Sequence, residues 1–124
     1  MDTETILFFE GHQAALPLYK TLVQKLKKHV PDAEIRVQKT QISFYRKHLF
    51  GCVSFLPVRK QRPQCFLTLS FGLGYALQHS RVDQVTEPYP GRYTHHVMLT
   101  GEEDEDEQLM NWLTEAASFA ACRE

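Results

Sequence analysis

The sequence lacks any long run of apolar residues. It has 124 residues, and no stretch approaches the ~18 consecutive apolar residues that a membrane span requires. Its first residues are acidic and show neither the basic region nor the small-residue cleavage site of a secretory signal. We therefore expect a cytoplasmic protein without membrane contact. This length has room for one domain only, so residues 1–124 are predicted to fold as a single domain.

Cysteine and the common catalytic motifs are also scarce. The three cysteines Cys52, Cys65 and Cys122 are odd in number and form no Cys-x-x-Cys pair, so they are expected to be reduced, buried thiols. The chain contains neither a Gly-x-Ser-x-Gly elbow nor a complete glycine-rich phosphate loop. No cofactor and no metal site is predicted from these patterns.

Acidic residues are missing from the middle of the chain. Residues 1–100 hold thirteen Lys and Arg against seven Asp and Glu, whereas residues 101–124 hold one Arg against eight acids. The stretch between Ile35 and Val82 has no acid at all. Its basic residues are Arg36, Lys39, Arg46, Lys47, Arg59, Lys60, Arg62 and Arg81. This basic segment is expected to attract an anionic partner or the acidic tail, unless its charges are only solvated strand ends and loops.

Two segments have the apolar spacing of amphipathic helices. In Ala15–Val30, apolar residues recur at steps of three and four, Pro17 fits the first turn, and Pro31 ends the pattern. The second helix is expected after Gly101, with the acids of residues 102–107 in its first turn and apolar residues continuing to Ala120. Residues 5–10 form a short apolar segment that fits either a helix or a strand.

The middle of the chain alternates β-branched or aromatic residues with polar ones, which is typical of strands. The predicted strands are 34–38, 41–46, 50–56, 64–71 and 92–100, with a further short strand around 82–85 and a turn at 88–91. Short connections between strands require antiparallel pairing. We therefore predict an α+β fold, a two-layer sandwich with a mainly antiparallel sheet of about five strands and two helices packed on one face.

Strand alternation divides the side chains between the two faces of this sheet. If the apolar residues of the strands face the helices, the opposite face receives a polar set: Gln41, Ser43, Tyr45, Lys47, Ser54, Thr68, Ser70, Thr94 and His96. His95 is sent to the helix-covered face, so only His96 is expected at an open surface. Such a polar face either recognises a ligand or is the ordinary exposed side of an antiparallel sheet.

Several members of this region suit the binding of an anion. Lys39, Thr40 and Gln41 bring an ammonium, a hydroxyl and an amide together between two strands, and Arg81 and Arg92 offer bidentate contacts. A histidine near Tyr45 or a carboxylate such as Glu87 suits acid–base chemistry instead.

Four strings of residues resemble a bacterial domain-of-unknown-function family, number fifty-six fifty-five, which is distantly similar to YdhG-like domains. These strings are Phe8–Gly11, Gln38–Phe44, Leu69–Leu73 and Glu87–Val97. The resemblance implies a recognition domain more than a self-contained enzyme. Its motif positions correspond to Lys39, Thr40, Gln41, Arg81, Glu87, Arg92, His95 and His96.

Four functions follow from these patterns. The leading hypothesis is a non-enzymatic binding module that holds an anionic small molecule or a nucleic-acid backbone on the polar, basic sheet face. The first alternative is a small hydrolase or transferase that uses His95 or His96 with Tyr45 and Glu87. The others are metal binding by a histidine with the tail acids, and a protein-interaction module that forms a homodimer through an exposed sheet edge.

Overall fold

The sheet confirms the predicted α+β class and antiparallel pairing. A computed structural model describes residues 2–58, 63 and 65–122. In this part of the chain six strands form one sheet in the order β1-β2-β3-β4-β6-β5, and every neighbouring pair is antiparallel. The strands are β1 Glu34–Val37, β2 Ile42–Arg46, β3 His48–Ser54, β4 Leu67–Leu73, β5 Gln84–Tyr89 and β6 Arg92–Leu99.

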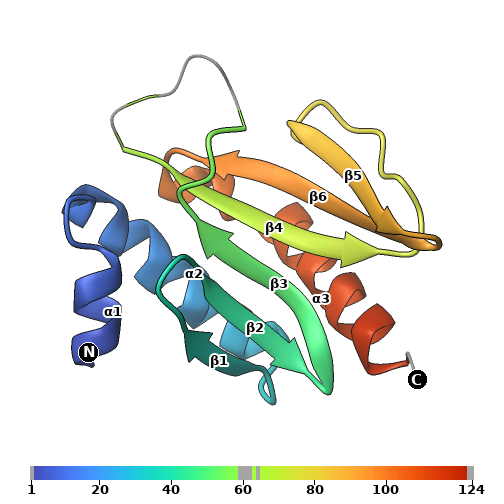
Figure 1. The fold of residues 1–124 in the computed structure, drawn as a ribbon, viewed down its shortest axis with the longest axis horizontal. Coiled ribbons are helices and arrows are strands. Elements are labelled where there is room, and N and C mark those ends of the chain that lie inside the picture. Colours follow the sequence, from blue (N-terminus) through green and yellow to red (C-terminus); the bar gives the residue numbers. More distant parts are fainter. Residues whose placement is uncertain (1, 59–62, 64, 123–124) are drawn as a thin grey trace.

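Two long helices cover one face of this sheet, as predicted for a two-layer sandwich. They are α2 Leu16–His29 and α3 Glu107–Ala121, and Figure 1 shows both behind the strands while the other face is open. The undecided segment near the N-terminus is helical, with α1 at Thr3–Phe8 beside the β1 edge. The Asp2 carboxylate caps α1 by accepting a hydrogen bond from the Thr5 N–H at 2.8 Å, and such caps stabilise short helices.

The hydrophobic core fills the space between the sheet and these helices. Of the strand residues predicted to face the helices, all but Phe55 are buried there, and His95 joins them with 0% of its surface exposed. Phe55 follows the end of β3 and is only partly buried, so its assignment to the helix-covered face is wrong. The side chains that fill most of this space are Ile42, Phe44, Val53, Leu69, Phe71, Val97, Leu99, Leu22, Leu26, Leu109 and Leu113. Burying this many large apolar side chains is the main stabilising contribution in a domain of this size.

The strands predicted at 50–56 and 64–71 are displaced, to β3 at His48–Ser54 and β4 at Leu67–Leu73. Two other predicted boundaries are also wrong. The acidic run does not form the first turn of the last helix: residues Glu102–Asp104 form a separate 3-10 helix, and α3 begins only at Glu107. The Asp104 carboxylate accepts hydrogen bonds from the Thr100 and Gly101 N–H groups at 2.9 and 3.2 Å. These bonds close the short 3-10 turn before α3 begins. The Asp106 side chain then caps α3.

The second wrong boundary concerns the strand near residue 85. It is a full edge strand, β5, that reaches Tyr89 and includes Pro88. Pro88 is tolerated because an edge strand has one side without ladder hydrogen bonds. The turn is therefore shorter than predicted and centres on Gly91, whose φ of 83° lies in the left-handed region that glycine favours.

Within the described ranges, every helix is too short or too polar to cross a lipid bilayer.

Candidate functional site

A row of polar side chains crosses the open face of the sheet. The register sets Cys52 of β3 opposite Ser70 of β4, and Ser70 opposite His96 of β6. The Ser70 Oγ lies 2.7 Å from the His96 Nδ1. Burial lowers the pKa of His96 and raises the pKa of the Cys52 thiol. At neutral pH the row is therefore uncharged, with a neutral imidazole and a protonated thiol.

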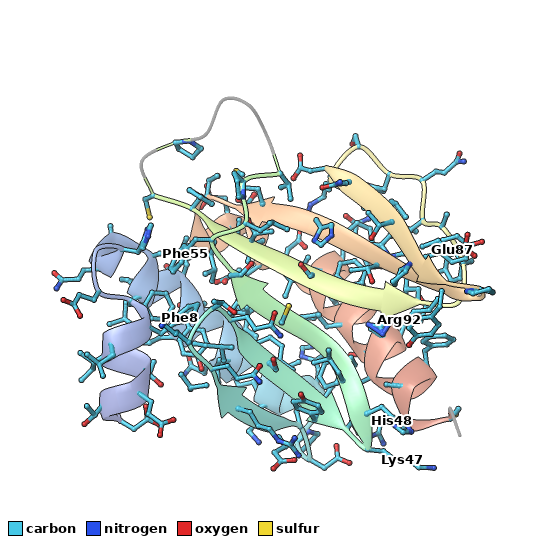
Figure 2. All side chains as sticks on the ribbon, viewed as in Figure 1. Phe8, Lys47, His48, Phe55, Glu87 and Arg92 are labelled. Carbon is cyan, nitrogen blue, oxygen red and sulfur yellow. The ribbon has the colours of Figure 1, made fainter. Side chains whose placement is uncertain are left out.

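A groove of about 600 Å³ lies above this row, within the range of ~300–1,000 Å³ that is usual for ligand pockets. Cys52, Ser70 and His96 belong to its floor, and the turn at residues 39–41 forms one side. The chain after β3, at residues 55–56, and the N-terminal segment, through Phe8 and His12, close one end. Figure 2 shows Phe8 and Phe55 together near α1, with Arg92 farther along the sheet.

Most hydroxyl groups of the open face are already hydrogen-bonded within the protein. Ser43 donates to the Gln38 side chain at 2.7 Å and accepts from Gln41 at 2.7 Å. Thr68 donates to the Leu56 carbonyl at 2.8 Å. Both hydroxyl residues are fully buried although they lie on the open face. The face is therefore less polar toward solvent than alternation alone predicts.

Arg92 lies across the sheet at the other end of the groove. Its guanidinium covers Gly72 of β4 so closely that a Cβ at Gly72 would be 2.6 Å from the nearer terminal nitrogen. It borders a hollow of about 140 Å³ that shares Gln41, Cys52, Ser70 and Thr94 with the groove. The Arg92 Nε is buried without a hydrogen-bond partner. Within the described residues the guanidinium pairs with no carboxylate.

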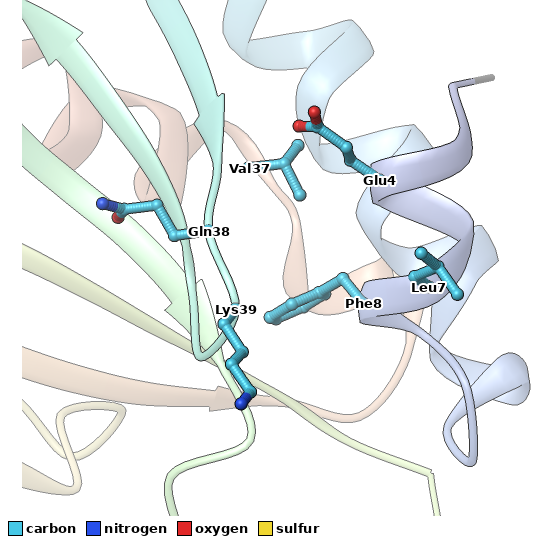
Figure 3. Close-up of a pocket in the computed structure, with 6 residues that line it drawn as sticks. All are labelled: Glu4, Leu7, Phe8, Val37, Gln38 and Lys39. Atoms are coloured by element: carbon cyan, nitrogen blue, oxygen red, sulfur yellow. The ribbon is translucent and has the colours of Figure 1, made fainter.

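Lys39, Thr40 and Gln41 lie together at the groove rim, in the turn between β1 and β2. Lys39 and Thr40 are exposed, and the Lys39 ammonium makes no ion pair with a described residue. Lys39 also borders a separate hollow of about 360 Å³ between α1 and β1. Figure 3 shows Leu7 and Phe8 on the helix side of that hollow and Val37 and Lys39 on the strand side.

The residues of the predicted acid–base set are not brought together. Tyr45 is on the open face but lies under the Arg36 guanidinium, 4.0 Å from its ring centre. Its strand, β2, is separated from β6 by β3 and β4, and the residue of β2 in register with His96 is Ser43, so Tyr45 and His96 are at least about 14 Å apart at their backbones. Glu87, on β5, accepts a hydrogen bond from the Gly91 N–H at 3.3 Å and raises the pKa of Tyr93.

His95 is a core residue. Its ring stacks on Phe71 with centroids 5.2 Å apart, and its Nε2 accepts the Leu77 N–H at 2.8 Å. Burial lowers its pKa, so the ring is neutral. His95 and His96 therefore point to opposite sides of the sheet, as strand alternation requires.

Arg81 does not reach the groove either. It donates to the Asp106 carboxylate at 2.9 Å and to the Gln108 side chain at 3.1 Å, and lies 5.7 Å from the Trp112 ring centre. These contacts fasten the segment before β5 to the start of α3. Arg81 therefore has a structural partner for its charge.

The basic segment is also not one continuous patch in the described structure. Arg36 pairs with Glu34 at 3.0 Å and Arg46 with Asp32 at 3.1 Å. The predicted contributions of Arg59, Lys60 and Arg62 lie outside the described residues. Lys39 at the groove rim and Arg92 in the adjoining hollow are basic residues that pair with no described carboxylate.

Sequence reasoning missed five groove residues, namely Phe8, His12, Cys52, Phe55 and Leu56. The cysteines were expected to be buried thiols, but Cys52 and Cys65 are half-buried and Cys122 is exposed. Alternation with the core residue Val53 was enough to assign Cys52 to the open face. Phe8 and His12 are different, because their approach to the sheet depends on how α1 packs. No spacing pattern within the chain reveals that contact.

No group of three or more His, Cys, Asp or Glu side chains that could hold a metal ion is found among the residues described above. The structure thus defines a small α+β domain with one helix-covered sheet face and one open face that carries a groove. The family model described as "Domain of unknown function (DUF5655)" matches residues 7–120, and the chain belongs to this family. No curated protein and no solved structure matches the chain. The more distant similarity to YdhG-like domains stays a prediction.

Proposed function

We propose that this domain is a binding module that holds an anionic small molecule in the groove of the open sheet face. The observation that carries the proposal is Arg92, whose partly buried guanidinium borders the groove without a carboxylate partner. The buried Arg92 Nε lacks a hydrogen-bond partner, and the guanidinium otherwise lies only 6.0 Å from the Tyr89 ring centre, so an anion that enters the groove gains a charge-assisted interaction there. Lys39 adds a second positive charge at the rim.

The size of the groove favours a small molecule over a nucleic-acid backbone. Proteins that follow a phosphate backbone line up several cations along it, whereas Arg36, Arg46 and Arg81 are paired with carboxylates. The acid–base alternative lacks support, because Tyr45, Glu87 and His96 do not share a site. Binding without catalysis therefore agrees best with the geometry.

The test is a thermal-shift and calorimetric screen of inorganic phosphate, short carboxylates and a single-stranded oligonucleotide at low ionic strength. We expect stabilisation by at least one small anion, with weaker binding as salt increases. Arg92→Gln should reduce the affinity about ten- to a hundredfold, the range expected for a hydrogen bond to a charged group. Charge reversal in Lys39→Glu should weaken the same binding.

Arg36→Gln is the matched control. Arg36 is on the same face but pairs with Glu34 and Tyr45 outside the groove, so its loss should leave anion affinity unchanged. Equal losses in Arg36→Gln and Arg92→Gln indicate a diffuse charge effect and contradict a groove site. Tighter binding of the oligonucleotide than of every small anion also overturns the proposal, and so does the absence of any stabilising anion.

A further inference from the structure

The two ends of the groove differ in chemistry. Beyond one end, in the adjoining hollow that shares Thr94 with the groove, lies the Arg92 guanidinium. At the other end the Phe55 ring is stacked with His12 at 3.8 Å and with Phe8 at 5.3 Å between centroids. Leu56 belongs to this apolar end and is 45% exposed. A ligand that fills the groove meets the Arg92 guanidinium beyond one end and mainly apolar side chains at the other, where Lys39 and His12 lie beside Phe8 and Phe55.

The floor between these ends offers few free polar groups. The Ser70 hydroxyl is occupied by His96, and the Ser54 hydroxyl accepts the Leu56 N–H at 3.3 Å. Cys52, between them in the groove, has a protonated thiol, which is a weak hydrogen-bonding group. A polar ligand such as a sugar therefore finds few partners along the floor. An apolar chain needs no hydrogen-bond partners and can lie along this floor.

The length of the floor can be estimated from the register. Gly72, beneath Arg92, and Thr68, opposite Ser54 at the apolar end, are four residues apart on β4, which corresponds to about 13 Å. A simple inorganic anion at Arg92 leaves most of this length empty. A medium-length organic molecule can occupy both ends at once.

We propose that the ligand is an amphipathic organic anion, with its carboxylate or phosphate head at Arg92 and its apolar tail against Phe8, Phe55 and Leu56. This inference rests on the proposed function, because it takes Arg92 as the anion site. Beyond the proposed function, the inference specifies how the ligand is oriented in the groove and that the part away from Arg92 is apolar. A tail of roughly eight carbons matches the floor.

The experiment is a calorimetric titration with butanoate, hexanoate and octanoate, with inorganic phosphate as the anion that has no tail. The affinity should rise about fourfold for each added CH₂ group, the increment for burying one methylene. Leu56→Ser should lower the affinity for octanoate about fivefold and leave that for butanoate unchanged. Arg92→Gln should weaken all three carboxylates by the same factor.

Leu7→Ser is the matched control, because Leu7 is equally apolar and is 60% exposed on α1 but lines the separate hollow beside β1. It should not change the dependence on chain length. If the carboxylates bind through Arg92 with equal affinities, the ligand is not amphipathic, although the proposed function stands. If neither phosphate nor any carboxylate binds, both proposals fail. A chain-length dependence that Leu7→Ser removes and Leu56→Ser does not would place the tail outside the groove.

Discussion

The two sides of the sheet treat ionisable groups differently. On the helix-covered side His95 is fully buried and neutral, and the buried Glu105 next to α3 has a pKa raised to about 8 by desolvation. The open side carries two basic side chains, Lys39 and Arg92, with which no described carboxylate pairs. Burial removes charge on the first side. On the open side, access to solvent and to a ligand permits charged side chains.

The largest expected difference between the two sides is in packing. Phe71 is 1% exposed and packs against His95 and Trp112. Phe71→Ala should lower the free energy of unfolding by about 3–5 kcal/mol, because it leaves a cavity between sheet and helix. Urea denaturation measures the change.

Thr94→Val is the control on the open face, where the same measurement should change by less than about 1 kcal/mol. A loss for Thr94→Val as large as that for Phe71→Ala would mean that the open face is packed against something in solution. That result would contradict the difference in packing between the helix-covered side and the open side.

The next largest effect concerns Glu105, whose carboxylate oxygens are buried without a hydrogen-bond partner. Its main-chain carbonyl accepts the Lys25 ammonium at 2.6 Å, and the positive charge of Lys25 only partly offsets the effect of burial on the pKa of Glu105. Because the folded pKa of about 8 is above the ordinary value of 4.5, the folded state favours the protonated acid. Its stabilising contribution is present below about pH 4.5 and is lost as pH rises through about 8.

Glu105→Gln should remove this loss. We compare the free energy of unfolding of the variant with that of the natural protein at each pH. The difference in favour of the variant should be about 2–4 kcal/mol larger at about pH 8.5 than at about pH 5. Urea denaturation at the two pH values gives this difference. Glu107→Gln, an exposed neighbour in the first turn of α3, should show none. An effect of Glu105→Gln that is the same at both pH values would mean that Glu105 is not protonated in the fold.

His95 and His96 allow the sharpest comparison, because they are adjacent in sequence. His95→Ala removes the stack on Phe71 and the acceptor of the Leu77 N–H, so thermal or urea unfolding should show a loss of about 2–3 kcal/mol. His96→Ala removes one hydrogen bond to Ser70 at a half-buried position and should cost about 1 kcal/mol. Equal costs would contradict the assignment of the two rings to different environments.

Alternation and helical spacing were sufficient to predict the class of fold and the orientation of most strand residues. Both patterns depend only on the residues within one helix or strand. The correct assignment of His95 and His96 to opposite faces of β6 is an example. The predicted start of α3 was wrong because Asp104 closes a separate turn before the helix while Asp106 caps the helix itself. Composition does not distinguish a capping acid from one inside a helical turn. The full length of β5 was missed because Pro88 is a strong turn signal in the sequence.

The candidate site was less predictable, because it depends on contacts between elements. Lys39, Thr40, Gln41 and His96 were predicted and line the groove, and Arg92 borders it. Arg81 was an equally good candidate by sequence, yet it is paired with Asp106 of the acidic run. Charge patterning indicates that basic and acidic segments attract each other, but not which arginine is paired and which stays available.

Gly72 offers the smallest and most specific test, because its substitution changes the open side without replacing a charged residue. The Arg92 guanidinium rests on Gly72, and a Cβ there would come within 2.6 Å of it. Gly72→Ala should therefore displace the guanidinium and weaken anion binding about tenfold, the loss of one hydrogen bond of ordinary strength. The measurement is a calorimetric titration with the tightest small anion of the screen. In an Arg92→Gln background the same Gly72→Ala change should have no further effect on affinity, since the group it displaces is gone. An additional loss in the double variant would show that Gly72 shapes the groove independently of Arg92, and the anion would then have to contact the sheet itself.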